Sequence, residues 1–179
     1  MQTKSKLDFN SLQIECERLL LTSITQGYTE VIYREFTNEI THYMIPATPK
    51  SIQEIDSFIE NSITNMEHGN EIILIILDNM TREFLGVCGL HGRSNPKEPM
   101  LGIWLKKNVH GNHYGQEAIK YLADWARNNI EFCHMVYPCD KDNIASRKIA
   151  EHLGGVIFHE GQTKTMSGTV LNQVAYKIL

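Results

Sequence analysis

A short stretch at residues 110–118 contains residue types that can bind phosphate. Gly111 and Gly115 lie between an apolar, strand-like run at residues 101–105 and a helical pattern at residues 116–129. The first N–H groups of a helix lack partners within the helix, and the helix dipole adds positive potential there. Glycines let the chain turn tightly and let a ligand approach the backbone. The spacing therefore predicts an anion-binding loop, although two glycines before a helix are also common in ordinary connections.

The bulk composition narrows the class of protein. The chain has 179 residues, 42% of them hydrophobic and 21% charged, which is ordinary for one soluble globular domain. Its formal net charge of −4 argues against a nucleic-acid binder that depends on a broad basic surface. The longest apolar run, residues 72–77, is too short to cross a bilayer, and the N-terminal residues lack the apolar stretch of a signal peptide. We therefore expect a cytoplasmic protein that binds neither nucleic acid nor membrane.

The cysteines and histidines do not predict a metal site. The four cysteines show no Cys-x-x-Cys spacing, so they are expected to be buried free thiols. His110 and His113 are three residues apart, but a metal would need further ligands at fixed spacing.

Hydrophobic periodicity predicts one domain of mixed architecture. Strands are expected at residues 14–22, 71–77, 84–90, 101–105, 132–137, 156–159 and 170–179, and helices at residues 28–36, 51–69, 116–129 and 140–153. Meandering strands come first and a strand–helix–strand crossover follows. We therefore expect an α/β (α+β) fold with a mixed, mostly antiparallel sheet of about seven strands and helices on both faces. Residues 1–10 are expected to be a flexible N-terminus, and residues 11–179 the domain.

Three further motifs occur in a fixed order around the glycine loop. Residues 17–21 read Glu-Arg-Leu-Leu-Leu, residues 102–105 read Gly-Ile-Trp-Leu, and residues 143–146 read Asn-Ile-Ala-Ser, followed by Leu153 and Gly154. In this order the chain resembles the GCN5-related N-acetyltransferase (GNAT) family over nearly its whole length. Within that family it resembles the branch that acetylates N-terminal amines of ribosomal proteins.

The resemblance implies that the glycine loop binds the pyrophosphate of acetyl-CoA. The cofactor-binding residues that it implies are Leu105, His110, Gly111, Asn112, His113, Tyr114, Gly115, Gln116, Asn143 and Ser146. Two positions depart from the family pattern: His110 replaces an arginine or glutamine, and His113 replaces a glycine. The Cβ of His113 could crowd the phosphate or oppose a positive φ, whereas its imidazole could contact the phosphate directly.

Acetyl transfer to an amine needs a base for the amine and a proton for the departing thiolate. Many GNAT enzymes place a tyrosine as the acid where this chain has Ala150, and the resemblance implies Ser146 in its stead. His91 is the expected base because an unperturbed imidazole titrates at about pH 6.5. Glu98, His134 and a water chain are the alternatives.

The predicted function is acetyl-CoA-dependent acetylation of a primary amine, such as the α-amino group of a ribosomal protein. Two alternatives stay open: a small-molecule acceptor (polyamine, amino acid or aminoglycoside), and a non-catalytic acyl-CoA-binding relic of the fold. The segments at residues 37–49 and 161–168 are expected to contact the acceptor. The resemblance also allows a homodimer, since dimers are common in the family.

Overall fold

A computed structural model describes residues 1–4 and 7–179. Its helices are α1 (Thr29–Glu35), α2 (Asn38–Thr41), α3 (Ile52–Glu67), α4 (Tyr114–Asn129) and α5 (Ile144–His152), with short 3-10 turns η1 (Phe9–Ser11), η2 (Gln26–Tyr28) and η3 (Lys107–Val109). Its strands are β1 (Gln2–Thr3), β2 (Gln13–Glu15), β3 (Leu19–Ser23), β4 (Glu71–Asp78), β5 (Phe84–His91), β6 (Met100–Leu105), β7 (Ile130–Glu131), β8 (Met135–Asp140), β9 (Val156–Lys164) and β10 (Val170–Ile178). Within the described ranges, no helix is both long and apolar enough to cross a membrane.

The strands form one large sheet and one small one. The large sheet has eight strands in the order β2-β3-β4-β5-β6-β8-β10-β9, and β1 pairs with β7 separately. All neighbours in the large sheet are antiparallel except β6 and β8. The predicted mixed, mostly antiparallel architecture is therefore confirmed. The strand expected at residues 14–22 is instead two strands, because the chain reverses at Glu17 and Arg18, where Cys16 N donates to Leu19 O over 2.9 Å.

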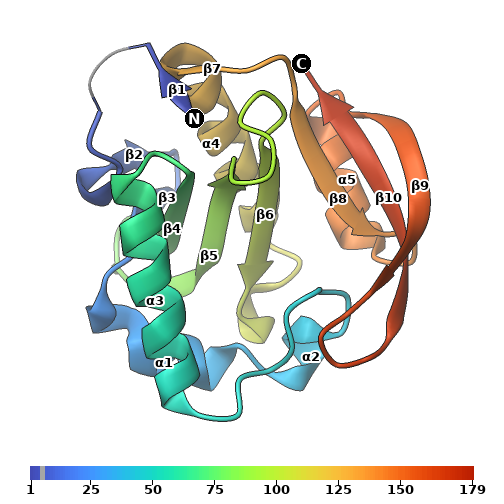
Figure 1. Cartoon of the computed structure of the whole chain (residues 1–179). Coiled ribbons are helices and arrows are strands. Elements are labelled where there is room, and N and C mark those ends of the chain that lie inside the picture. Colours follow the sequence, from blue (N-terminus) through green and yellow to red (C-terminus); the bar gives the residue numbers. More distant parts are fainter. Residues whose placement is uncertain (5–6) are drawn as a thin grey trace.

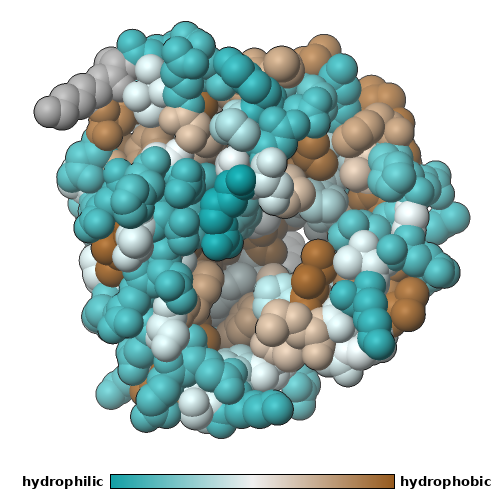
Figure 2. All heavy atoms as spheres, in the orientation of Figure 1, coloured by the Kyte–Doolittle hydropathy of each residue, from teal (hydrophilic) through white to brown (hydrophobic). Residues whose placement is uncertain are grey.

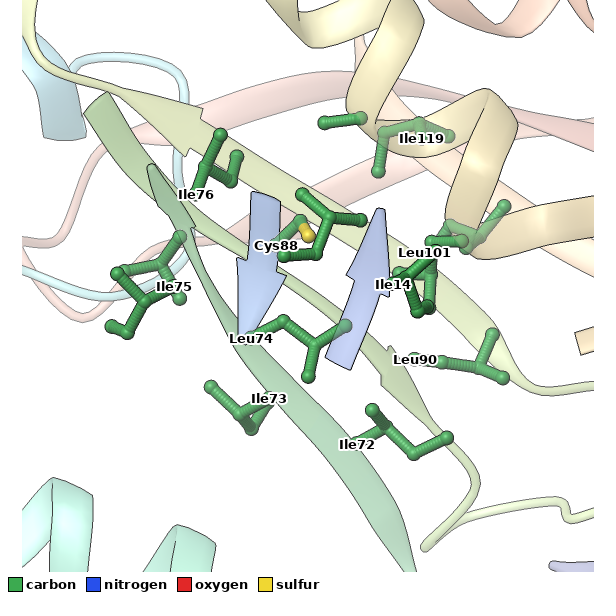
Figure 3. Close-up of a cluster of buried hydrophobic side chains, with 14 of the residues drawn as sticks. Ile14, Ile72, Ile73, Leu74, Ile75, Ile76, Cys88, Leu90, Leu101 and Ile119 are labelled. Carbon is green, nitrogen blue, oxygen red and sulfur yellow. The ribbon is translucent and has the colours of Figure 1, made fainter. Parts of the chain in front are cut away.

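Helices cover both faces of the large sheet. In Figure 1, α1 and α3 lie in front of the sheet and α4 and α5 lie behind it. Strand β4 is buried on both faces, as its unbroken apolar run predicts. Figure 3 shows its side chains alternating, with Leu74 and Ile76 on the side of Ile119 of α4, and Ile73 and Ile75 on the opposite side.

Strands β6 and β8 are parallel but pair only where they begin. Their one register pair is Met100 with Val136. A strand was predicted to end before Pro138, but β8 continues through this proline to Asp140. Val136 N donates to Pro99 O on the β6 side, and backbone groups two residues apart point the same way, so the Pro138 nitrogen also faces β6. The missing N–H costs little there because β6 has already diverged.

The N-terminal segment packs on the domain at two points. Residues Gln2–Thr3 pair with β7, and Phe9 is only 3% exposed. The flexibility expected for residues 1–10 stays a prediction.

Gly86 of β5 allows the close approach of β6. A Cβ at this position would lie 2.2 Å from Trp104 O and 2.8 Å from Leu105 Cα. We expect Gly86→Ala to lower the free energy of unfolding by about 1–3 kcal/mol, because backbone atoms must move. Urea denaturation measures this. In the control Gly102→Ala the new Cβ would meet only the His91 ring, at 3.5 Å, so equal losses in both variants would contradict the prediction.

Candidate active site

A cavity of about 510 Å³ lies at the C-terminal end of β6, where this strand no longer pairs with β8. Ile103 and Trp104 both line it, although adjacent side chains of a strand point to opposite faces. On the side of the sheet where Phe36 packs against Trp104, residues of α2 line the cavity. On the other side it is lined by residues of α4 and α5. It therefore passes from one face of the sheet to the other, and we call it the through-sheet cavity. Figure 2 shows the front face hollowed near its centre.

Most of the residues predicted to bind a cofactor line this cavity. Those lining it are Leu105, His110, Gly111, His113, Tyr114, Gly115, Gln116, Asn143 and Ser146. Asn112 and His91 are not among the lining residues. The Asn112 side chain turns inward instead, where its Nδ2 donates to Val109 O over 3.1 Å.

The glycine loop, residues 106–113, delivers the chain from β6 to the start of α4. Gly111 has φ +84° and His113 has φ +61°, so both adopt the left-handed region. The Cβ of His113 does not prevent this conformation, which costs an L-residue about 1–2 kcal/mol. His113 is the N-cap of α4 without capping it through its side chain, and its Nδ1 lies 3.1 Å from Gln116 Oε1. The first amides of α4 therefore face the cavity uncapped by this side chain.

Arg18, at the turn between β2 and β3, braces the glycine loop from outside. Its backbone N and its Nε each lie 2.7 Å from a Glu117 carboxylate oxygen, and its Nη1 donates to Asn112 O over 3.1 Å. The guanidinium also lies 4.7 Å from the centre of the Tyr114 ring. This gives the arginine of the Glu-Arg motif a structural role: it joins the loop to the first turn of α4.

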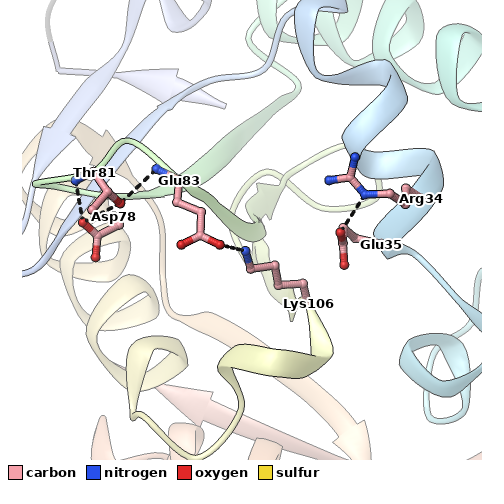
Figure 4. A network of polar contacts seen from close by, with 6 residues as sticks. All are labelled: Arg34, Glu35, Asp78, Thr81, Glu83 and Lys106. Carbon is pink, nitrogen blue, oxygen red and sulfur yellow. Dashed lines mark hydrogen bonds and ion pairs between the residues drawn. The ribbon is translucent and has the colours of Figure 1, made fainter.

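The other end of the loop is fixed by Lys106, which is only 5% exposed. Its ammonium pairs with Glu83 of the β4–β5 connection, as Figure 4 shows, and its backbone N donates to Leu85 O over 2.9 Å. His110 also folds back on β6, with Nε2 lying 2.9 Å from Leu105 O. Since a carbonyl only accepts, Nε2 carries the proton in this arrangement. The loop is thus held at both ends by contacts outside itself.

Asn143 and Ser146 lie together at the start of α5. The cap of this helix is Asn143, whose Oδ1 accepts from Ser146 N over 3.1 Å, so the helix expected from residue 140 begins only at Ile144. Asp140 instead accepts from the backbone of Asp142 and of Asn172. Ser146 is therefore fixed at the wall of the cavity by its own helix cap.

Tyr137 is a contact of Ser146 that the sequence did not reveal. Its hydroxyl lies 3.0 Å from Ser146 Oγ, and burial raises the pKa of this phenol, so it stays protonated. Burial also raises the pKa of the neighbouring Cys139 thiol to about 11. Tyr137 lies on β8 and Ser146 on α5, so the two residues come together only in the folded chain, and no spacing along one element predicts their contact.

His91 ends β5 on the opposite face of the sheet from α5. Its Nδ1 lies 3.0 Å from Glu71 Oε2, and its side chain is one-third exposed. The alternative bases lie near each other, with Glu98 Oε1 3.9 Å from His134 Nε2, beyond hydrogen-bond range. His134 is buried and packs edge-on against Phe158. In the part of the chain that the structure describes, no three His, Cys, Asp or Glu side chains gather as a metal site requires.

A family model described as "Acetyltransferase (GNAT) domain" matches residues 18–156. The chain belongs to the GNAT acetyltransferase family. A curated relative, the uncharacterized protein YkkB of Bacillus subtilis (strain 168), is 33% identical over 79 residues. That match covers 43% of this chain and 46% of YkkB, so it spans less than half of the relative's length.

Solved structures of other GNAT proteins share the fold. The microcin C7 self-immunity acetyltransferase MccE, in complex with acetyl-CoA and AMP, matches with a TM-score of 0.78 at 23% identity, covering 91% of this chain and 93% of that one. RimL, a ribosomal L7/L12 α-N-protein acetyltransferase, matches with a TM-score of 0.78 at 18% identity and 94% coverage of both chains. A GNAT acetyltransferase from Bacillus anthracis gives 0.77 at 13% identity, covering 94% and 98%.

Removing the Arg18 brace should destabilise this GNAT domain. We expect Arg18→Gln to lower the free energy of unfolding by about 1–2 kcal/mol, because the Glu117 carboxylate loses its partner while its side chain is only 10% exposed. The matched control is Arg34→Gln, which breaks an exposed pair with Glu35 and should change stability by less than about 0.5 kcal/mol. Chemical denaturation distinguishes the two, and a loss no larger than the control's would contradict the role of Arg18.

Proposed function

We propose that the protein is an acetyl-CoA-dependent N-acetyltransferase whose acceptor is the α-amino group of a protein N-terminus. The observation that carries this proposal is the through-sheet cavity, which has unpaired helix amides at one end and a fixed serine in its wall. A cofactor entering beside α4 and an amine entering from the opposite face would meet between β6 and β8. Holding two reactants in alignment accounts for a large share of catalysis.

The cofactor would lie along the α4 and α5 side of the cavity. Its pyrophosphate would accept from the first amides of α4, where the helix dipole favours negative charge. The cations lining the cavity, Lys107 and Lys148, add positive potential, although Lys107 is partly neutralised by Glu39 at 2.5 Å. Backbone groups of Leu105 and the side chain of Asn143 would hold the pantetheine arm.

Transfer would form one bond and break another. The neutral amine attacks the thioester carbonyl, a C–N bond forms, the C–S bond breaks, and the thiolate leaves. His91 would take the proton that the amine loses. Ser146 would donate a hydrogen bond to the leaving thiolate, which takes its proton from solvent, and Tyr137, which burial keeps protonated, would donate a hydrogen bond to Ser146 Oγ and orient it.

The entrance on the acceptor side is bridged. Met166 N, in the β9–β10 turn, donates to Ile45 O after α2 over 2.9 Å, so segments 37–49 and 161–168 touch each other. A bridged entrance suits an extended chain end, and RimL, which is named as an α-N-protein acetyltransferase, shares the fold. A small-molecule amine is the second candidate, since MccE is named as a self-immunity acetyltransferase. A cytoplasmic location and a homodimer stay predictions.

A panel of acceptors tests the proposal. The purified chain is mixed with acetyl-CoA and either peptides with free α-amines, N-terminally blocked peptides containing lysine, polyamines or aminoglycosides, and released thiol is measured. We expect the free α-amine peptides to react fastest. Faster reaction of a small amine would favour the second candidate. Binding of CoA in calorimetry without turnover of any acceptor would indicate a non-catalytic relic.

Ser146 and Tyr137 should act as one unit. We expect Ser146→Ala to lower kcat by about 100-fold and Tyr137→Phe by about 10-fold. The double variant should be no slower than Ser146→Ala alone, because Tyr137 acts through the serine. The control is Tyr121→Phe on α4, outside the cavity, with unchanged kcat. Additive losses in the double variant would contradict this joint action of the two hydroxyls.

A further inference from the structure

A buried carboxylate lies behind the candidate base. Glu71, the first residue of β4, is only 2% exposed, although a carboxylate is seldom buried without partners. It is the direct cross-strand neighbour of His91. Its Oε2 lies 3.0 Å from His91 Nδ1 and 3.3 Å from Arg93 Nε. Two cationic or donor groups therefore converge on one oxygen of this side chain.

The carboxylate fixes which nitrogen of the imidazole can accept a proton. An ionised carboxylate only accepts, so Nδ1 carries the hydrogen in this contact and Nε2 presents a lone pair. Nε2 lies over two glycines: it is 3.1 Å from where a Cβ of Gly89 would stand and 3.5 Å from where a Cβ of Gly102 would stand. Gly102 is on the same face of β6 as Trp104, two residues further on, and Trp104 lines the through-sheet cavity.

We propose that Glu71 is a positioning residue that aims the His91 Nε2 lone pair at the acceptor amine, an inference that rests on the proposed function. As the amine loses its proton, His91 becomes an imidazolium, and the carboxylate stabilises that charge. Arg93 holds the same oxygen and compensates the buried negative charge while the imidazole is neutral.

The charged groups around the imidazole come from three segments. Glu71 belongs to β4, Arg93 to the β5–β6 loop, and the Met1 ammonium donates to Gly69 O just before β4. Strand β6 contributes the uncharged Gly102 and Met100. Glu71 and Arg93 carry opposite charges, so replacing one or the other with glutamine changes the charge near the imidazole in opposite directions.

The test compares pH profiles of kcat/KM for the full chain and two variants, with acetyl-CoA and the best acceptor of the panel. We expect Glu71→Gln to lower kcat/KM by about 10- to 100-fold and to move the acidic limb of the profile to lower pH, because the imidazolium loses its carboxylate. Arg93→Gln should move the acidic limb of the profile to higher pH, because the Glu71 carboxylate then interacts with the imidazole alone. CoA affinity by calorimetry should change less than twofold in both.

The matched control is Asp124→Asn, which removes a carboxylate that also meets two cations, Lys120 and Arg127, on the outer face of α4. Its profile should equal that of the unmodified chain. An active chain whose acidic limb stays in place in both Glu71 and Arg93 variants would overturn the inference while leaving the proposed function intact. If Glu71→Gln fails to fold, Arg93→Gln decides alone, since Arg93 is 56% exposed. A chain that acetylates no acceptor at any pH would instead refute the proposed function.

Discussion

The constraint on which the rest of the structure depends is that β6 and β8 pair once and then part. A continuous sheet would fill the space between them with ladder hydrogen bonds. Here the single pair of Met100 with Val136 is followed by divergence, and a proline nitrogen faces the gap. Backbone pairing does not close the gap beyond this pair, and the cavity at the C-terminal end of β6 is lined by residues from both faces of the sheet. Nine of the ten residues predicted to bind the cofactor line this cavity, whereas the proposed base His91 lies outside its lining.

The glycine loop owes its shape to contacts from distant parts of the chain. A left-handed histidine at 113 would relax in an isolated loop, because its Cβ opposes that conformation. Arg18 and the Glu83–Lys106 pair hold the two ends of the loop against β3, β5 and α4. Strained backbone persists where its surroundings fix it, and such strain is concentrated at functional sites.

The sequence predicted what depends on local pattern and missed what depends on distant contacts. The unbroken apolar run of β4, the glycine-bearing turn before α4 and the mixed sheet all follow from period and composition. The turn at Arg18 was missed because an apolar run on both sides of it reads as one strand. The continuation of β8 through Pro138 was not predicted, because a proline is tolerated there only since β6 does not pair with β8 at that point. The contacts of Ser146 with Tyr137 and of His91 with Glu71 join separate elements, and no spacing along one element encodes them.

The two side-chain pairs to which the proposed function gives a role in proton transfer or hydrogen bonding lie on opposite faces of the same sheet. Tyr137 and Ser146 are on the α5 side, whereas Glu71 and His91 are on the α3 side. Neither pair could assist the other through a closed sheet, since packed strands would separate them. The gap between β6 and β8 is the place where a group donating to a leaving sulfur and a group accepting from an attacking amine could serve one reaction. Under the proposed function, the Tyr137 phenol would support Ser146 from β8, in a chain that has Ala150 on α5.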